Sequence, residues 1–336
     1  LEYQGKCATW DLDAIGMRGE DYLKPDKLQD SLFPQTINLL KGGIVYADAV
    51  NTVSPTYAQE ILTPSMGYHL DRTLNQYRSK LSGILNGIDQ KIWNPETDKF
   101  LAKNFSTEGS LAQIESAKKG NQKELQKRFN LAETKGPWVG AVTRLASQKG
   151  PELIEEAMNY TLEQGGVFVL LGTSPIPQIQ QHFEKLKQKH QKNHHLLLQL
   201  TYDEALAHLI YAALDFTVVP SYFEPCGLTQ LIAMRYATIP IVRSTGGLKD
   251  TVFDCDDPMV PVQRRNGFAF SNPSDLKQTL ERAFALQKSD PATFQSLIRR
   301  AVHTDSSWKK PTKQYLKLYE GLCKLSNAFL MKKRLA

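Results

Sequence analysis

The sequence predicts an α/β protein whose main part is a doubly wound parallel sheet. From about residue 137 onward, short apolar runs alternate with stretches in which apolar residues recur at helical spacing. The apolar runs are rich in β-branched residues, and the connections between runs and helical stretches are short. Strands and helices that take turns in this way form right-handed crossovers, which place the strands parallel in one sheet.

Five strand and helix pairs carry this prediction. In order, each strand and its helix cover residues 137–145 and 152–164, 166–172 and 178–190, 195–200 and 203–214, 215–220 and 227–236, and 238–243 and 248–252. Further helices are expected at about residues 272–287, 291–303 and 309–329. The segment 106–126 is polar and rich in lysine, and it is predicted to be an exposed loop and helix.

The first third of the chain has a different pattern. The stretch DAVNTVSP predicts one strand followed by a helix that opens at Ser54, and LSGILNGI predicts a second strand. Because no strand and helix pair precedes them, this part resembles the end of a domain whose beginning is absent. We therefore expect it to expose apolar side chains such as Ile37, Leu40 and Ile44.

The composition is that of an ordinary globular protein. Of the 336 residues, 41% are hydrophobic and 23% are charged, and no run approaches the roughly 18 apolar residues of a membrane span. The formal net charge of +6 is spread along the surface segments, whereas nucleic acid binding needs a concentrated basic stripe with stacking aromatics. The four cysteines are scattered, which favours a reducing compartment over disulfides or structural zinc.

The segment SYFEPCGLTQ, residues 221–230, is predicted to be a turn between a buried strand and a helix. In an open parallel sheet such turns line the crevice at the carboxyl ends of the strands, where ligands bind. Glu224 in this turn is therefore a candidate site residue. Cys226, taken alone, is more often a small buried side chain than a reactant.

Three other turns at strand ends carry residues that suit a nucleotide. Arg144 and Lys149 in TRLASQKG offer a planar guanidinium and a compact ammonium, which suit a diphosphate, although solvated loop cations are equally common. Gly246 and Gly247 in STGGL allow close approach of the backbone to a ligand, but glycine pairs are also ordinary in turns. Tyr202 could stack on a base or serve as a core aromatic. Together the turns predict a pocket for a nucleotide that bears a polar sugar.

The sequence disfavours other common nucleotide chemistries. Neither G-x-G-x-x-G nor G-x-x-x-x-G-K-[ST] occurs, which argues against a dinucleotide oxidoreductase and a P-loop nucleotidase. His208 lies one helical turn after Glu204 and is interpreted as a packed helix histidine rather than a catalytic base. Because no set of His, Cys and carboxylate residues has metal-ligand spacing, we predict no metal.

Four longer motifs stand out in the chain, and they are LNGIDQKIWNPETD, TRLASQKG, FEPCGLTQL and RSTGGLKDTV. They resemble motifs of bacterial glycogen synthase and plant starch synthase, the ADP-glucose-dependent α-1,4-glucan synthases. The resemblance extends from Tyr3 to Ser306. It implies the GT-B fold, with an active site between two Rossmann-like domains. It also implies transfer of glucose from ADP-glucose to the non-reducing end of an α-1,4-glucan, with retention at the anomeric carbon and without a cofactor or metal.

The resemblance also implies roles for individual residues. Arg144 and Lys149 would clamp the diphosphate, and Tyr202 would stack on adenine. Glu224 would lie against the glucosyl group, either as a nucleophile or as a stabiliser of positive charge. The other implied contacts are Cys226, Gly227, Leu228 and Thr229 at the sugar, Thr245, Gly246 and Gly247 at the diphosphate, and Asn86 at the interdomain hinge.

Three parts of the chain follow from the same resemblance. Residues 1–92 are expected to be the end of the acceptor-side domain with the hinge, residues 93–308 the donor-binding domain, and residues 309–336 a helix that crosses back to the first domain. A Lys-x-Gly-Gly-Leu loop, an acidic residue and a His-Asn pair that serve the family's site have no counterpart here. We therefore expect this chain, taken alone, to have little or no glucan synthase activity.

Two alternatives to a synthase remain open. The first is a truncated or degenerate homologue that would hold ADP or ADP-glucose without transferring glucose. The second is a different retaining nucleotide-sugar glycosyltransferase, which is disfavoured because FEPCGLTQ is more specific than the general pattern of that superfamily. The expected partners are ADP-glucose and glycogen or starch, with no nucleic acid and no membrane, while the oligomeric state stays open. The expected location is the bacterial cytoplasm or, alternatively, the plastid stroma.

Overall fold

The computed structural model describes residues 1 and 3–334. The chain divides into two compact units, one formed by Leu1–Asn86 with Lys309–Ala336 and the other by Gly87–Trp308. The domain boundary predicted between residues 92 and 93 therefore lies inside the second unit.

The second unit is built on one parallel sheet. Among the described residues its strands are β5 (Trp138–Val142), β6 (Val167–Leu171), β7 (Leu196–Gln199), β8 (Phe216–Val219), β9 (Ile239–Arg243) and β10 (Phe268–Phe270). Their order across the sheet is β7, β6, β5, β8, β9 and β10, and every neighbouring pair is parallel. The first five strands are those that the sequence predicts, whereas the run FAF of β10 is too short to give a signal.

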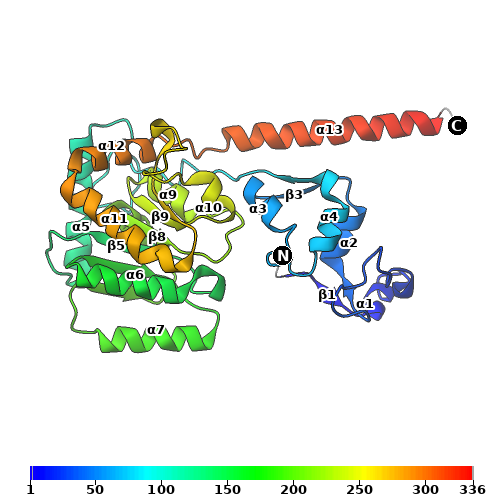
Figure 1. The fold of residues 1–336 in the computed structure, drawn as a ribbon, viewed down its shortest axis with the longest axis horizontal. Helices are drawn as coiled ribbons and strands as arrows, with labels where there is room; N and C mark the ends of the chain where they lie inside the picture. The colour runs from blue at the N-terminus through cyan, green and yellow to red at the C-terminus, as the bar shows by residue number, and fades with distance from the viewer. Residues whose placement is uncertain (2, 335–336) are drawn as a thin grey trace. The chain divides into compact units, whose positions relative to one another are not determined.

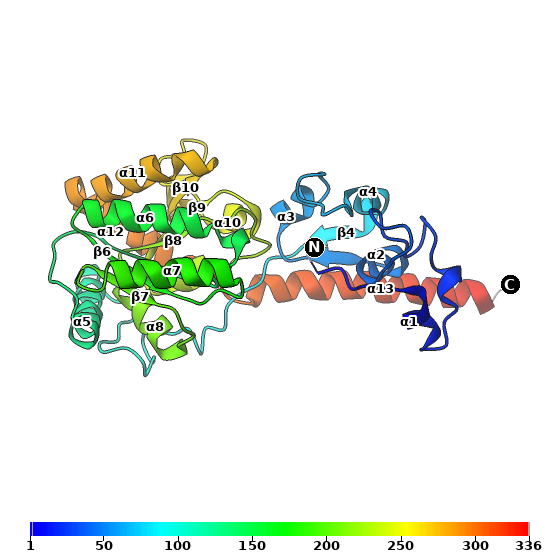
Figure 2. The same ribbon diagram turned by 90° about the horizontal axis from the view of Figure 1, so that it is seen from below.

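Helices cover both faces of this sheet (Figure 1). They are α5 (Leu111–Phe129), α6 (Pro151–Glu163), α7 (Pro177–Lys189), α8 (Glu204–Ala213), α9 (Thr229–Arg235), α10 (Gly246–Thr251), α11 (Leu276–Ser289) and α12 (Pro291–Val302), with short 3-10 turns η3 (Ser147–Lys149), η4 (Val262–Arg264) and η5 (Pro273–Asp275). Figure 2 shows α6 and α11 on one side of the strands and α5 and α8 on the other. The predicted doubly wound arrangement is therefore confirmed for this unit.

The core of the second unit explains why its strands read as continuous apolar runs. Val139, Phe168, Phe216, Ile241 and Phe268 are fully buried within the sheet. A parallel strand covered by helices on both faces buries every side chain, so it shows no alternation of apolar and polar residues.

Helix α5 differs from the exposed helix that the sequence predicts. Its residues Ile114, Ala117, Lys118 and Leu125 are buried, because this face of the helix packs against α8. Lys118 interrupts the apolar stripe in the sequence, so the stripe was not recognised. In the fold its amino group is buried and hydrogen-bonded. Its Nζ donates to Thr238 Oγ1 at 2.9 Å.

The first unit is made of short elements. They are β1 (Lys6–Cys7), β2 (Ile37–Asn38), β3 (Val50–Thr52), β4 (Leu81–Gly83), α1 (Thr9–Asp13), α2 (Leu39–Tyr46), α3 (Pro55–Glu60), α4 (Asp71–Gln76), α13 (Lys309–Arg334) and the turns η1 (Gly19–Asp21) and η2 (Arg78–Lys80). Strands β1 and β2 pair antiparallel, and β3 and β4 pair parallel. The predicted helix start at Ser54 is confirmed, because its side chain accepts a hydrogen bond from the Tyr57 amide at 2.8 Å.

The expectation that Ile37, Leu40 and Ile44 form an exposed apolar face was wrong. Other large apolar side chains of the first unit, among them Trp10, Ile15 and Phe33, are exposed. Ile37 lies in β2 rather than on a helix, is fully buried, and packs with Leu12 and Leu28. Ile44 is buried in a separate cluster, against which the half-buried Leu40 packs. The short helices and loops fold over one another and cover these side chains without a large sheet.

Helix α13 belongs to the first unit. Asn51 Nδ2 donates to Tyr315 Oη at 3.2 Å, which connects the middle of β3 with this helix. Neither α13 nor any other helix in the described part of the chain has the length and apolar character that crossing a membrane requires.

Candidate active site

The strand order creates a switch point between β5 and β8. The chain moves from β5 outward to β6 and β7, returns to β8 on the other side of β5, and continues to β9 and β10. Connections that leave in opposite directions open a crevice at the carboxyl ends of the two central strands. The loop after β5 carries Arg144 and Lys149, and the loop after β8 carries Glu224. The crevice is therefore flanked by predicted site residues.

Lys149 and Glu224 contact each other at this switch point. Lys149 Nζ lies 2.5 Å from Glu224 Oε2, and the two side chains are 19% and 8% exposed. Ser221 Oγ donates to the same carboxylate oxygen at 2.9 Å. The loops are also joined through the main chain, because the Tyr222 amide donates to the Gln148 carbonyl at 2.8 Å. The carboxylate is therefore held in one place by donors from both loops.

Gly150 allows the loop after β5 to pass close to the end of β8. Its φ is +65°, and a Cβ at this position would lie 2.8 Å from the Pro220 carbonyl oxygen. A residue with a side chain would be strained in this conformation and would push the two loops apart. This glycine, which lies between η3 and α6, thus sets the short distance between Lys149 and Glu224.

The glycine turn after β9 supports the Glu224 turn rather than standing apart from it. The Gly247 amide donates to the Glu224 carbonyl at 2.9 Å, and a Cβ on Gly247 would lie 1.8 Å from the Cys226 carbonyl oxygen. Thr245 and Gly246 are buried beside it. The amide of Gly247, which the sequence assigns to the diphosphate, is therefore occupied by the protein in this structure.

Two further side chains, one buried and one half-buried, hold this turn and were not predicted as site residues. Gln230 is fully buried, and its Nε2 donates to the Gly227 carbonyl at 2.7 Å and to Thr251 Oγ1 at 3.0 Å. Arg243 at the end of β9 donates from its guanidinium to the Tyr222 carbonyl at 2.5 Å. A glutamine or arginine gives no sequence signal of such a role, because Thr251 and Tyr222, which they bond, each lie 21 residues away and are brought close only by the fold.

The sugar-contact residues predicted in the Glu224 turn occupy different environments. Cys226 is buried, Gly227 has φ of +70°, and Leu228 is exposed. Thr229 begins α9 and lines the cavity described next. Asn86 ends the first unit and is half-buried, while the other predicted site residues belong to the second unit.

A cavity of about 440 Å³ opens beside this turn, at the carboxyl ends of β5, β6 and β7. This volume is in the range of small-molecule sites. Arg144, Tyr202 and Thr229 line it, together with Trp93 and Tyr211, whereas Lys149 and Glu224 are not among its lining residues. Tyr202 is 84% exposed. The structure thus places part of the predicted site in the cavity and part in the neighbouring Glu224 turn.

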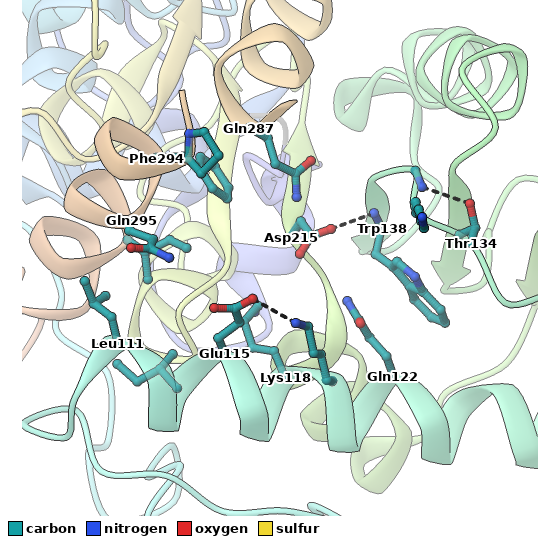
Figure 3. Close-up of a pocket in the computed structure, with 16 residues that line it drawn as sticks. Leu111, Glu115, Lys118, Gln122, Thr134, Trp138, Asp215, Gln287, Phe294 and Gln295 are labelled. Atoms are coloured by element: carbon teal, nitrogen blue, oxygen red, sulfur yellow. Dashed lines mark hydrogen bonds and ion pairs between the residues drawn. The ribbon is translucent and has the colours of Figure 1, made fainter. Parts of the chain in front are cut away.

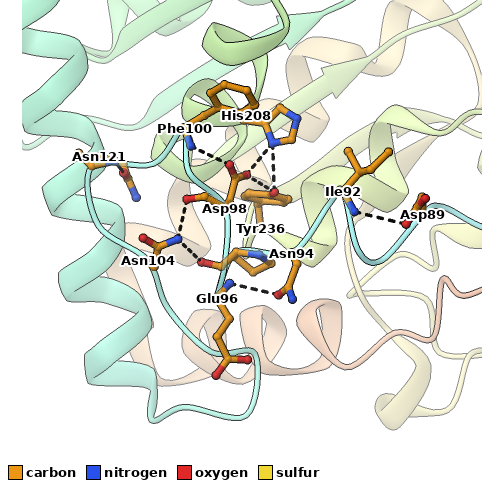
Figure 4. Close-up of polar contacts among 12 residues, drawn as sticks. Asp89, Ile92, Asn94, Glu96, Asp98, Phe100, Asn104, Asn121, His208 and Tyr236 are labelled. Carbon is orange, nitrogen blue, oxygen red and sulfur yellow. Dashed lines mark hydrogen bonds and ion pairs between the residues drawn. The ribbon is translucent and has the colours of Figure 1, made fainter.

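His208 is buried behind this cavity, as the sequence analysis expects of a packed histidine. Its Nδ1 lies 2.5 Å from Asp98 Oδ2, and the Tyr236 hydroxyl donates to the same carboxylate oxygen (Figure 4). Burial alone would raise the pKa of Asp98, but hydrogen bonds from His208 and Tyr236 hold that pKa below its ordinary value.

A second cavity, of about 410 Å³, lies at the opposite edge of the sheet. Lys118, Trp138, Asp215 and Phe294 line it, near the amino ends of β5 and β8 (Figure 3). Burial lowers the pKa of Lys118 to about 7, although the Asp215 carboxylate opposes this shift. None of the predicted site residues lines this cavity, and ligands of open parallel sheets bind at the carboxyl ends.

The described residues contain one group with metal-ligating atoms close together, formed by Asp254, Cys255 and Asp256. Arg282 already pairs with both carboxylates, at 3.0 Å in the case of Asp254. Burial and the two neighbouring carboxylates raise the pKa of the Cys255 thiol, which disfavours the thiolate that a metal needs. This group does not fit a metal site.

Comparison with known proteins found two sequence families along the chain. The family described as "Starch synthase catalytic domain" matches residues 1–76, and the family described as "Glycosyl transferases group 1" matches residues 122–301. A "Glycogen synthase" of Protochlamydia amoebophila is 44% identical over 333 residues, which are 96% of this chain and 66% of that protein. A "Probable starch synthase 4, chloroplastic/amyloplastic" of Arabidopsis thaliana is 46% identical over 323 residues, which are 95% of this chain and 31% of that protein.

A solved structure is similar as well. The "Catalytic domain of Starch Synthase IV from Arabidopsis thaliana bound to ADP and acarbose" matches with a TM-score of 0.90 and 45% identity. The match covers 95% of this chain and 64% of that chain. This chain therefore spans slightly less than two thirds of the bacterial relative and about a third of the plant protein.

Proposed function

The chain belongs to the group 1 glycosyltransferase family, and we propose that it forms the donor-binding part of an ADP-glucose-dependent α-1,4-glucan synthase. The resemblance to glycogen and starch synthases is confirmed by relatives that are 44% and 46% identical over nearly the whole chain. The predicted α/β fold class of GT-B type is confirmed by the parallel sheet and the structural likeness to a starch synthase.

The observation that carries the proposal is the pairing of Lys149 with Glu224 at the switch point, next to a cavity of nucleotide size. We infer that the cavity takes the nucleoside and that Arg144 and Lys149 bind the diphosphate. Glu224 then lies where the next group of the donor, its glucosyl unit, would be. The similar starch synthase structure was solved with ADP, which supports the same nucleotide here.

The two paired side chains have complementary tasks in glucosyl transfer. As the bond between glucose and the diphosphate breaks, negative charge grows on the leaving phosphate and positive charge grows on the glucosyl carbon. Lys149 has three N–H donors, so it can bond a phosphate oxygen and Glu224 at once. The Glu224 carboxylate stabilises the positive charge. Its Oε2 already accepts bonds from Lys149 and Ser221, which lowers its nucleophilicity and favours the stabilising role over attack.

We propose further that transfer proceeds without a bound metal, because charge on the diphosphate is balanced by Arg144 and Lys149. The polymer partner would be glycogen or starch. A location in the bacterial cytoplasm or in plastids, the two kinds of cell compartment in which such synthases are expected, remains a prediction.

Calorimetric titration of the chain with ADP tests the binding half of the proposal. We expect Lys149→Ala to raise the Kd for ADP about tenfold to a hundredfold, because removal of a charge-assisted contact costs about 1.5 to 3 kcal/mol. Lys187→Ala, an exposed lysine on α7, is the matched control and should bind as the parent does. Equal affinity in parent and Lys149→Ala would remove the diphosphate assignment.

The transfer half needs a longer protein, since the chain spans about two thirds of its bacterial relatives. A fusion that supplies the remaining third from the Protochlamydia protein is incubated with ADP-glucose, labelled in glucose, and glycogen. We expect label in the polymer. ADP binding by the chain combined with no transfer by a folded fusion would instead indicate a binding module.

A further inference from the structure

An indole ring forms part of the wall of the 440 Å³ cavity. Trp93, in the motif WNPETD, lines this cavity together with Tyr211 and Ile232. Trp93 is not among the predicted site residues, because it precedes the sheet by more than 40 residues and follows no strand end. Its position on the wall results from the tertiary fold.

Aromatic side chains hold the indole from several directions. The ring of Trp93 stacks on His208 with centroids 4.0 Å apart and an interplanar angle of 13°. Tyr211 and Tyr236 meet it edge-on, with centroids at 5.8 Å and 6.2 Å. These contacts restrict the ring to one orientation, and the part of the indole that they leave uncovered faces the cavity.

His208 is fixed in turn by polar contacts. Its Nδ1 donates to Asp98, which also accepts the Tyr236 hydroxyl and, through Oδ1, the Phe100 amide at 2.9 Å (Figure 4). His208 Nε2 is buried and has no hydrogen-bond partner among the described residues. An apolar side chain in place of His208 would leave no unsatisfied atom, so the histidine lowers the stability of the fold at this point. Its hydrogen bond to Asp98 fixes the orientation of the imidazole ring on which Trp93 stacks.

The loop that carries Trp93 is also anchored on both sides of the ring. The Trp93 amide donates to the Asp89 carbonyl at 2.9 Å. Farther along, Asn104 Nδ2 donates to the carbonyls of Asp98 at 2.7 Å and Pro95 at 3.1 Å (Figure 4). These bonds tie the segment into one unit around Asp98, so the indole and its support move together.

We propose that Trp93 is a specificity-determining residue that favours a purine over a pyrimidine nucleoside diphosphate, and that His208 and Asp98 are positioning residues that hold its ring. A flat indole gains more contact with a two-ring base than with a one-ring base. The inference rests on the proposed function, because it takes this cavity to be the nucleoside site. The inference adds to the proposed function the residue that selects the base of the nucleotide.

Three probes separate a contact with the base from a general structural role. The chain is titrated calorimetrically with ADP, UDP and inorganic pyrophosphate. We expect Trp93→Ala to raise the Kd for ADP about tenfold, as loss of a base-stacking aromatic does, and to change the Kd for pyrophosphate by less than about twofold. The preference for ADP over UDP should fall accordingly. Trp93→Phe, which keeps a smaller ring and preserves packing, should show a smaller change in the same direction.

Tyr160→Ala is the matched control. Tyr160 is a half-buried aromatic residue that stacks on Phe284, with centroids 5.6 Å apart, and it does not line the cavity. Its replacement should leave all three affinities unchanged. His208→Gln can still donate to Asp98 but offers no flat ring, so it should reduce the ADP to UDP preference while pyrophosphate binding persists.

The outcomes are distinguishable. An unchanged ADP to UDP preference in both Trp93 variants, or an equal loss of ADP and pyrophosphate affinity in Trp93→Phe, overturns the assignment of the base contact. An unchanged preference in His208→Gln overturns the positioning role alone. Failure of the parent chain to bind either nucleotide overturns the proposed function and this inference together, whereas ADP binding that is insensitive to Trp93 overturns only the inference.

Discussion

Replacement of Gly247 by alanine tests whether the glycine turn positions Glu224. An ideal Cβ on Gly247 would lie 1.8 Å from the Cys226 carbonyl oxygen and 2.4 Å from its carbonyl carbon. Ordinary contact needs about 3.4 Å, so the two turns would have to separate by roughly 1.5 Å. Both contacting atoms belong to the backbone, so no side-chain rotation relieves the overlap.

The structure allows the size of this effect to be estimated. Separation of the turns breaks the 2.9 Å bond from the Gly247 amide to the Glu224 carbonyl, which contributes about 1 kcal/mol. Overpacking of a rigid site adds about 1 to 3 kcal/mol. We therefore expect Gly247→Ala to lower the free energy of unfolding by about 2 to 4 kcal/mol. A displacement of Glu224 by about 1 Å should also reduce glucosyl transfer about a hundredfold.

Urea unfolding of the chain measures the first effect, and the transfer assay on the fusion measures the second. Gly43→Ala in α2 is the matched control, because a Cβ there meets nothing within 4 Å. This control should be neutral or should stabilise the chain by about 0.5 to 1 kcal/mol. The reasoning is refuted if Gly247→Ala unfolds at the parent's urea concentration and transfers glucose at the parent's rate.

Three further predictions address the chemistry and the pH dependence. Glu224→Gln in the fusion should abolish most transfer, measured with labelled ADP-glucose, while calorimetry shows an ADP affinity close to that of the parent, because the carboxylate acts on the glucosyl group. Retained turnover would contradict this role. EDTA should leave transfer unchanged, and a loss that added Mg²⁺ restores would show that a metal takes part. Lys118 has a pKa of about 7 when folded and an ordinary pKa of 10.5, so between these values the unfolded chain binds more protons and stability should rise with pH. The slope approaches about 1.4 kcal/mol per pH unit, and urea midpoints at pH 7.5 and 9 should show a smaller increase in Lys118→Met than in the parent.

Much of the second unit, and one helix start in the first unit, could be predicted from local sequence patterns. The strands from β5 to β9 were predicted because each is buried on both faces and therefore consists of a short run of consecutive apolar residues. The helix start at Ser54 was found because a capping side chain acts on an amide three residues away. Glu224 and Lys149 were found as candidates because they follow strands, and the carboxyl ends of parallel strands share one edge of the sheet.

Other features could not be predicted because they depend on which segments become neighbours. The buried face of α5 was missed because Lys118 is charged in the sequence and is paired with Thr238 only in the fold. The burial of Ile37 was missed because Leu12 and Leu28, which cover it, come from separate short elements. No local sequence pattern indicates which distant segments will pack together.

The sequence by itself determined the alternation of strands and helices, the turns that carry polar groups, and the motifs shared with glucan synthases. These features are local, so the residues that cause them are adjacent in the chain. Only the tertiary structure decided that Lys149 bonds Glu224, that the Gly247 amide supports the Glu224 turn, and that Trp93 rests on His208 in the cavity wall. The partners in the first and third of these contacts are 75 and more residues apart, and the strand order, with β8 beside β5, is what brings Lys149 and Glu224 together.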